Sequence, residues 1–188
     1  MQNSWISLGL MSGTSGDGVD ASIIRTNGIN QYELIKDKYF EYDSKIYKDI
    51  HSLKEKIHKI EHLKKYKNEI NNLERNITIF HAEIIKQLNI SENTLIGFHG
   101  QTIYHNPDEK ISRQLGNGKL LNQLTNRNIV FNFRKNDILK GGQGAPLTPV
   151  FHYLISIKNE IRLPVCFLNI GGISNITIVK DRENLSEL

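Results

Sequence analysis

The stretch GLMSGTSGDGVDASII, residues 9–24, decides the fold of this sequence. A turn rich in glycine, hydroxyl and carboxylate side chains separates two apolar runs, WISLGLMS before it and VDASIIRT after it. Both runs read as strands, and the Asn27–Gly28 pair after the second is a strong signal for another tight turn. Because YELIKDKYFEY can supply a third strand, we predict an antiparallel three-strand meander with the glycine-rich loop at its first turn.

The chemistry of this loop comes from three glycines, two hydroxyls and two carboxylates. The residues are Gly13, Gly16 and Gly18, then Thr14 and Ser15, then Asp17 and Asp20. The glycines let the backbone approach a ligand and turn N–H groups toward an anion. The carboxylates suit an anion only through a cation, such as the Mg²⁺ of a bound nucleotide. The loop matches neither GxxxxGK[ST] nor GxGxxG. A mobile hairpin tip and a phosphate-binding loop both remain open at this point.

The composition is that of an ordinary globular protein, with 38% hydrophobic and 23% charged residues and a formal net charge of +4. Much of the basic excess lies between Lys36 and Lys86, where a solvated helix face explains it better than a nucleic-acid surface. The one cysteine, Cys166, lies in the apolar run PVCFLNI and is expected to be buried; a single thiol indicates a reducing compartment. Neither a membrane span nor a signal-peptide pattern is apparent, so we expect a cytoplasmic protein without a membrane partner.

Two helix-period series of apolar residues fall within residues 46–88. Their members are Ile46, Ile50, Leu53, Ile57 and Ile60, then Tyr66, Ile70, Leu73, Ile77, Phe80, Ile84 and Leu88. The phase slips near Leu63, so we expect two helices or one bent helix, with a coiled-coil dimer as the alternative. The histidines of this stretch are expected to be solvated; they are His51, His58, His62 and His81. Two of them, His58 and His62, have the spacing of metal ligands, but no third ligand is apparent.

From residue 94 onward, apolar runs alternate with glycine-rich loops. TLIGFHGQTIYH is predicted as a strand that enters a polar loop, and NIVFNFRKND as a strand with a charged end. GGQGAPLTPVFHYLI reads as a loop leading into a helix, and VCFLNIGGISNITIV as a strand, a turn and a strand. Together with the meander and the helices, these units predict an α/β fold with a mixed sheet and a helical insertion.

The loops of this second part carry side chains suited to a sugar or an anion. GFHGQT, residues 97–102, combines an imidazole, an amide and a hydroxyl, although a lone histidine such as His99 is more often structural. Arg134 can hold a carboxylate or a phosphate in a bidentate manner, or pair with Asp137 at the surface. Gln143 adds an amide to the segment GGQGAP. The glycines at 171 and 172 fit a second phosphate-facing hairpin or an ordinary tight turn.

Five segments resemble motifs of the anhydro-N-acetylmuramic acid kinases of bacterial cell-wall recycling. In chain order they are GLMSGTSGDGVDAS, GFHGQTIYHNP, QLGNGKLLNQLT, FRKNDILKGGQGAPLTPVFH and LNIGGISNIT. The resemblance covers nearly the whole chain apart from the lysine-rich helical stretch. It implies an ATPase core of the actin, sugar-kinase and Hsp70 type, in which two lobes surround a deep cleft. It also implies that ATP and water convert 1,6-anhydro-N-acetylmuramate into N-acetylmuramate 6-phosphate and ADP.

The same resemblance implies roles for individual residues. It assigns a first nucleotide-binding hairpin, with Asp17 near Mg²⁺, to Gly13, Thr14, Ser15, Gly16, Asp17, Gly18, Val19 and Asp20. It assigns the sugar side of the site to His99, Gln101, Thr102, Arg134 and Gln143. The pair Gly171 and Gly172 falls where the sheet of the family continues toward the cleft.

The sequence departs from the family pattern at single positions. Gly16 stands where a leucine is usual, Phe98 where a serine is common and Asn132 where an acidic residue is usual. None of these differences removes an obvious reactive group, although Asn132 can lose a charge pairing.

The larger departure is in length, because family members are much longer. Their general-base aspartate lies in a later segment like GFDTGPGN, so the catalytic base of this protein is unknown and is expected beyond Leu188. Asp181 has no matching context. We therefore expect residues 1–188 to form an N-terminal lobe, inactive alone, that needs a separate C-terminal lobe or a second copy. The alternative is a non-catalytic module that binds sugar or phosphate.

Overall fold

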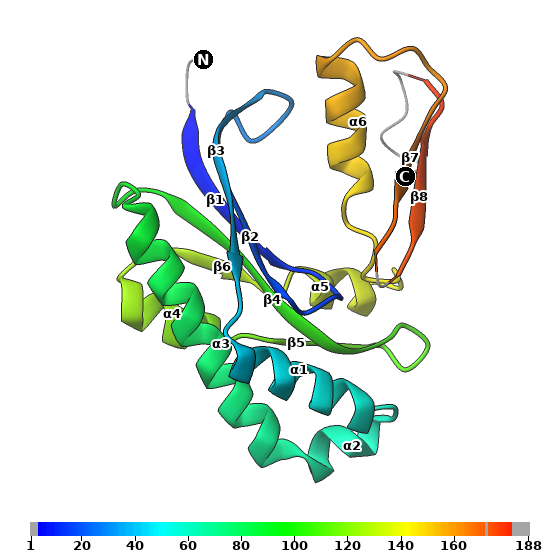
Figure 1. Ribbon diagram of the computed structural model, residues 1–188. Helices are drawn as coiled ribbons and strands as arrows, with labels where there is room; N and C mark the ends of the chain where they lie inside the picture. Colours follow the sequence, from blue (N-terminus) through cyan, green and yellow to red (C-terminus); the bar gives the residue numbers. More distant parts are fainter. Residues whose placement is uncertain (1–3, 172, 182–188) are drawn as a thin grey trace.

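A mixed sheet forms the centre of the protein, and the computed structural model describes residues 4–171 and 173–181 (Figure 1). In spatial order its strands are β3 (Tyr32–Glu41), β2 (Gly18–Thr26), β1 (Trp5–Ser12), β4 (Leu95–Asn106) and β5 (Ile111–Leu115), and β6 (Ile129–Phe131) also pairs with β4. Strands β1, β2 and β3 are antiparallel neighbours, which confirms the predicted meander. Strand β4 runs parallel to β1 and β6 and antiparallel to β5, so the predicted mixed α/β fold is also confirmed.

The segment GFHGQT lies inside β4, so the prediction of a polar loop there is wrong. The pairing of β4 with β1 shifts register between Leu10 and Met11, and His99 is the extra residue at this bulge. Gly100 follows with φ +73°, in the left-handed region that favours glycine. The strand then continues and pairs with β5. A bulge therefore accounts for glycines that the sequence pattern assigned to a loop.

Helices lie together on one side of the sheet in Figure 1. They are α1 (Ser44–Lys56), α2 (Ile60–Lys65), α3 (Lys67–Leu88) and α4 (Gly118–Thr125). Residues 46–88 therefore form three helices, where two or one bent helix were expected. Asp43 fixes the start of α1, because its carboxylate accepts hydrogen bonds from the N–H groups of Lys45 and Ile46 at 2.8 Å each. No helix in the described residues has the length and hydropathy that a membrane crossing requires.

The apolar stripes of α1 and α3 pack into the core beneath the sheet. Ile50, Leu73 and Ile77 are fully buried there together with Phe98 of β4. The faces that could form a coiled coil are thus used within the chain.

His81 also lies on this buried face, so the expectation that it is solvated is wrong. Its side chain is fully buried, its ring packs 4.8 Å from the ring of Phe98, and its Nδ1 lies 2.7 Å from the carbonyl oxygen of Ile77. Burial lowers the pKa of His81 to about 4, so the ring is neutral at pH 7 and Nδ1–H donates to that carbonyl. The cause is its position four residues after Ile77 and three before Ile84, both on the core face of α3.

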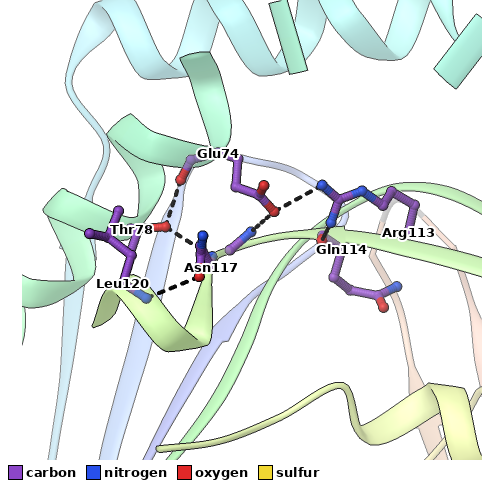
Figure 2. A network of polar contacts seen from close by, with 7 residues as sticks. Glu74, Thr78, Arg113, Gln114, Asn117 and Leu120 are labelled. Carbon is purple, nitrogen blue, oxygen red and sulfur yellow. Dashed lines mark hydrogen bonds and ion pairs between the residues drawn. The ribbon is translucent and has the colours of Figure 1, made fainter. Parts of the chain in front are cut away.

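A polar network fastens the turn between β5 and α4 to helix α3 (Figure 2). The carboxylate of Glu74 accepts hydrogen bonds from Arg113 Nη2 at 2.9 Å and from the N–H of Gly116 at 3.1 Å. The hydroxyl of Thr78 donates to the Glu74 carbonyl at 2.6 Å and accepts from the N–H of Asn117 at 3.0 Å. Asn117 also provides the N-cap of α4. The QLGNG part of the third motif is therefore a structural corner that anchors the edge of the sheet.

Two helices and a hairpin complete the described part of the chain. They are α5 (Phe133–Leu139), α6 (Pro149–Lys158), β7 (Val165–Asn169) and β8 (Asn175–Val179). Helix α6 and the hairpin confirm the sequence prediction, whereas α5 stands where a charged strand end was expected. Figure 1 shows α6 and the hairpin apart from α1 to α4, on the other side of the sheet.

The hairpin packs on α6 through one of its faces. His152 of α6 stacks on Phe167 with ring centroids 4.7 Å apart, and its Nδ1 lies 2.9 Å from the Thr177 hydroxyl. Side chains alternate along a strand, so Cys166 points to the opposite face and is exposed. The expectation of a buried cysteine is therefore wrong.

Candidate functional site

The sequence-predicted site residues gather at one edge of the central sheet. Strands β1 and β6 both run parallel to β4, so their carboxyl ends lie at the same edge. Residues 13–17, here called the glycine loop, follow β1, and helix α5 with Arg134 follows β6. Between them, β4 carries His99, Gln101 and Thr102. Ligands of open α/β sheets bind outside the carboxyl ends of the strands, so this edge is the candidate site.

Side-chain donors from two distant elements hold consecutive carbonyl groups of the glycine loop. The carbonyl oxygen of Gly13 accepts a hydrogen bond from Gln101 Nε2 on β4 at 3.0 Å and another from the N–H of Gly16 at 3.2 Å. The carbonyl oxygen of Thr14 accepts a hydrogen bond from the ammonium group of Lys54 on α1. The loop is thus fixed by partners that lie outside it.

These anchors determine where the next two amides point. In a trans peptide the C=O of one residue and the N–H of the next point in opposite directions. The N–H groups of Thr14 and Ser15 therefore point away from Gln101 and Lys54, and neither has a hydrogen-bond partner in the described part of the chain. Both residues are exposed. Two successive outward N–H groups form the kind of concave donor site that binds an anion.

The acidic residues of the hairpin differ in their surroundings. Asp17 is exposed, and its Oδ1 accepts a hydrogen bond from the Ser15 hydroxyl at 2.6 Å. This bond lowers the pKa of Asp17 below its usual value, so the carboxylate is ionised at neutral pH. Asp20 is exposed on β2, whereas Val19 is fully buried and belongs to the core. Among the described residues, no three His, Cys, Asp or Glu side chains come close enough to hold a metal ion together.

Gln101 lies under the glycine loop rather than on an open surface. Its side chain is fully buried, and its Oε1 lies 2.5 Å from the hydroxyl of Ser12. The Ser12 oxygen accepts the hydroxyl proton of Tyr42 at 3.0 Å, which leaves its own proton for Gln101 or for the Gly18 carbonyl at 3.0 Å. The Gln101 side chain therefore contacts the backbone of the glycine loop and is not exposed at the surface.

The structure brings His99 and Arg134 together. The Nε2 atom of His99 lies 3.1 Å from Arg134 Nε and 2.8 Å from Arg134 Nη2, and His99 Nδ1 lies 2.7 Å from the Gly100 carbonyl. Burial, with a smaller contribution from Arg134, lowers the pKa of His99 to about 4. The ring is therefore neutral, with its proton on Nδ1, and Nε2 accepts from the guanidinium group. His99 therefore fixes the position of the Arg134 guanidinium group. The Nη1 atom of Arg134 has no hydrogen-bond partner among the described residues.

A strip of half-buried polar side chains continues from this pair along β4 and β5. Gln114 Nε2 donates to Thr102 Oγ1 at 3.2 Å and to Ser112 Oγ at 2.7 Å, and His105 Nδ1 lies 2.9 Å from Ser112 Oγ. Burial, and then Arg134, lowers the pKa of His105. Thr102 was predicted from the sequence, whereas Gln114, Ser112 and His105 were not. Knowledge of the strand register, which pairs Thr102 with Gln114 and His105 with Ser112, would have identified them.

Gln143, the last residue predicted for the sugar side, lies after α5. It is exposed in a loop that Asp137 fastens, because the Asp137 carboxylate accepts from the N–H of Gly144 at 2.6 Å. No ion pair joins Arg134 and Asp137 in the described residues, so the alternative of a surface pair is wrong.

Two predictions made from the sequence fall near or past the end of the described part of the chain. Gly171 is exposed between β7 and β8, whereas its neighbour Gly172 lies outside the described residues. The catalytic base was expected beyond Leu188, and Leu188 itself also lies outside the described residues. The described residues therefore assign no catalytic base, and its place after Leu188 stays a prediction.

The mixed sheet and its helices have the fold of the sugar-kinase, ATPase-like class. The sequence model of one family within this class, described as anhydro-N-acetylmuramic acid kinase, matches residues 5–186. The chain belongs to this family.

Curated relatives agree with this assignment, and each is named anhydro-N-acetylmuramic acid kinase. The relative from Pelagibacter ubique is 55% identical over 188 residues, which cover 98% of this chain and 50% of the relative. The relative from Agrobacterium fabrum is 35% identical over 187 residues, covering 95% of this chain and 50% of the relative. The relative from Rhizobium etli is 36% identical over 179 residues, which cover 92% of this chain and 48% of the relative. The chain thus spans about half the length of the curated relatives it matches.

Proposed function

We propose that this chain is the phosphate-binding half of an anhydro-N-acetylmuramic acid kinase. In the proposed reaction, water adds across the 1,6-anhydro bond of anhydro-N-acetylmuramate, O6 takes the γ-phosphoryl group of ATP, and ADP leaves. The product is N-acetylmuramate 6-phosphate, which returns cell-wall sugar to metabolism. Since ATP is supplied inside the cell, we place the reaction in the cytoplasm. The observation that carries the proposal is the pair of outward N–H groups at Thr14 and Ser15.

Asp17 fits a role near Mg²⁺. Mg²⁺ is commonly held by one or two carboxylates together with the phosphate oxygens of its substrate, rather than by an all-protein cage. The exposed, ionised carboxylate of Asp17 is two residues from the outward amide of Ser15 and offers one such ligand. When bound, Mg²⁺ would neutralise charge on the phosphates of ATP. The protein contributes the amides, which bind and orient the phosphate chain.

On the sugar side, Arg134 fits the single carboxylate of N-acetylmuramate. The guanidinium group is half-buried, and two of its nitrogens already contact His99, which fixes the plane of the guanidinium group. Burial lowers the pKa of Arg134, yet the group stays charged at any physiological pH. A fixed, partly desolvated cation binds a carboxylate more strongly than a mobile surface arginine does. Thr102 and Gln143 remain proposed sugar contacts at the same edge of the sheet.

A partner for this half is suggested by the outer face of the β7–β8 hairpin. The register pairs Cys166 with Ile178 and Leu168 with Ile176. All four side chains are exposed and share the face turned away from α6. A contiguous exposed apolar face of this kind marks an interaction surface. We propose that the second half present in the relatives covers it, and a second copy of this chain is the alternative occupant.

A reconstitution assay tests the proposed function. The chain, the C-terminal half of the Pelagibacter ubique relative and an equimolar mixture would each receive Mg–ATP and anhydro-N-acetylmuramate. We expect N-acetylmuramate 6-phosphate only from the mixture, because stabilising the transition state needs groups from both walls of the cleft. Turnover by the chain alone would contradict the proposal that this chain needs a second half for activity. Binding of sugar or Mg–ATP without turnover in the mixture would favour the non-catalytic module.

A further inference from the structure

We propose that Lys54 and Gln101 are positioning residues that hold the glycine loop ready for a phosphate group before any ligand arrives. The inference rests on the proposed function, because it explains how the outward amides of Thr14 and Ser15 come to be presented. It concerns contacts within the protein and assigns neither residue a contact with the ligand.

Lys54 lies in an unusual setting for a lysine on a surface helix. Its side chain is half-buried, and burial lowers its pKa. No carboxylate of the described residues lies within ion-pair distance of its ammonium group; the charge of Asp17 acts on it only from farther away. Partial burial of an ammonium group without a paired carboxylate is costly. Its hydrogen bond to the Thr14 carbonyl, 40 residues away in sequence, is the contact that compensates.

Gly16 makes this approach between α1 and the loop feasible. A Cβ atom at position 16 would lie 2.9 Å from Ile50 Cγ2 and 3.2 Å from Lys54 Nζ, both on α1. It would also lie 3.8 Å from Gln101 Oε1, so the residue sits between the two proposed anchors. Its φ of +72° is also in the region that favours glycine. The absence of a side chain here lets α1 come close enough for Lys54 to reach the loop.

Gln101 provides the second anchor, and its own orientation is fixed. The Tyr42 hydroxyl donates to Ser12, and the Ser12 hydroxyl donates to Gln101 Oε1 at 2.5 Å, the nearer of its two acceptors, since the Gly18 carbonyl lies at 3.0 Å. That bond leaves the Nε2 donor to face the Gly13 carbonyl, 88 residues away in sequence. The bonds that join Tyr42, Ser12 and Gln101 are buried, with Ser12 at 1% and Gln101 at 0% exposure, and the bond to Gly13 is part-buried. A loop ordered in this way does not lose its conformational entropy again on binding, which raises affinity.

The test uses the 188-residue chain labelled with ¹⁵N, in the wild type and in Lys54→Met, Lys54→Arg and Gln101→Met. Lys48→Met is the matched control, because Lys48 is exposed on the same helix. Backbone order parameters of Thr14 and Ser15 are measured without ligand. The affinity for tripolyphosphate, a phosphate chain without a nucleoside, is then measured by calorimetry with Mg²⁺.

We expect order parameters near 0.85 for the loop amides of the wild type and below about 0.6 in Lys54→Met and Gln101→Met. Tripolyphosphate affinity should fall about tenfold in both, Lys54→Arg should restore most of it, and Lys48→Met should match the wild type. If the loop amides of Lys54→Met are as ordered as those of the wild type, the inference is wrong. If the wild type fails to bind tripolyphosphate, the proposed function is contradicted instead. In that case the order parameters of the loop amides still show whether Lys54 and Gln101 position the loop. Because Gln101 is buried, the Lys54 variants decide the matter if Gln101→Met does not fold.

Discussion

The guanidinium group of Arg134 is held against the imidazole of His99 by two contacts, from Nε at 3.1 Å and Nη2 at 2.8 Å to the same Nε2 atom. One nitrogen acceptor thus fixes the orientation of a cation on a different element, 35 residues away in sequence. Because we propose that Arg134 binds the sugar, His99 should affect sugar binding without contacting the sugar itself.

The first prediction follows from this pair. Replacing His99 with leucine removes the acceptor for Arg134, so the guanidinium group regains rotational freedom. The affinity for anhydro-N-acetylmuramate should fall about tenfold, and Arg134→Gln should lower it at least as much. Calorimetry on the chain with the sugar measures both. The exposed Arg75→Gln is the matched control and should leave the affinity unchanged; equal affinities in the wild type and Arg134→Gln would contradict the role of Arg134.

The second prediction concerns Gly16. Leucine at this position would adopt φ +72° and place its Cβ atom 2.9 Å from Ile50 Cγ2. We expect Gly16→Leu to lower the free energy of unfolding by about 2 to 3 kcal/mol, from backbone strain and overpacking together. Urea unfolding measures the change.

Two other glycines serve as controls for this substitution. Gly141 has φ +94° with nothing within 4 Å of a Cβ atom, so Gly141→Ala should show strain alone, about 1 kcal/mol. Gly13 lacks a positive φ, and a Cβ atom there would make only an ordinary contact of 3.6 Å with Ser15 Oγ, so Gly13→Ala should be nearly neutral. Equal stability of Gly16→Leu and Gly141→Ala would show that a side chain at position 16 does not clash with α1.

The third prediction concerns stability against pH. The pKa of His81 is about 4 in the folded protein and near its ordinary value of 6.5 in the unfolded chain. Between these values the unfolded state binds more protons, so the free energy of unfolding falls as the pH drops from 6.5 toward 4. His99 contributes in the same direction for the same reason. For His81 the full effect amounts to roughly 3 kcal/mol.

Replacing the histidine tests this assignment. His81→Phe keeps a ring against Phe98 and removes the titrating group, so its stability should fall less steeply below pH 6.5 than that of the wild type. His58→Gln, at an exposed histidine, should leave the slope unchanged. Urea unfolding at several pH values measures the slopes. A wild-type slope retained in His81→Phe would contradict the assignment.

The local elements of this fold were largely predictable from the sequence, because their signals are local. Strand alternation and the Asn27–Gly28 turn predicted the meander, and the helical periods predicted α1 and α3. Helix α5 was missed because it is short and Asn132, at its N-cap, makes no side-chain hydrogen bond there and has φ +61°. The bulge at His99 was missed because glycines within a strand and glycines in a loop look alike in sequence.

The candidate site was predictable only in part, since its decisive contacts are not local. The glycine loop, His99 and Arg134 were all named from the sequence. Lys54 was not named, and Gln101 was named only for the sugar side, because the contacts of these residues with the loop span 40 and 88 residues. His81 was treated as solvated because of its charged neighbours, although its spacing from Ile77 and Ile84 already placed it on the apolar face. Cys166 was assigned to the core because an apolar strand does not reveal which of its faces is covered.

The fourth prediction concerns the apolar face of the hairpin. Cys166 is exposed and lies among Leu168, Ile176 and Ile178 on that face. In the chain alone, its thiol should react readily with a maleimide reagent, and the chain should self-associate as its concentration rises. Adding the C-terminal half of the Pelagibacter ubique relative should slow the reaction at least about tenfold and suppress self-association, because a packed interface excludes water and reagent. Unchanged labelling in a mixture that has regained activity would show that the second half docks elsewhere.

The central claim is that the glycine loop binds the phosphates of ATP through the amides of Thr14 and Ser15. It is tested most directly by titrating the ¹⁵N-labelled chain with Mg–ATP and following every backbone amide resonance. The largest shifts should occur at Thr14, Ser15 and their neighbours in residues 13–17, and they should saturate. Saturating shifts confined to another part of the chain, or no shifts at millimolar Mg–ATP, would contradict the account.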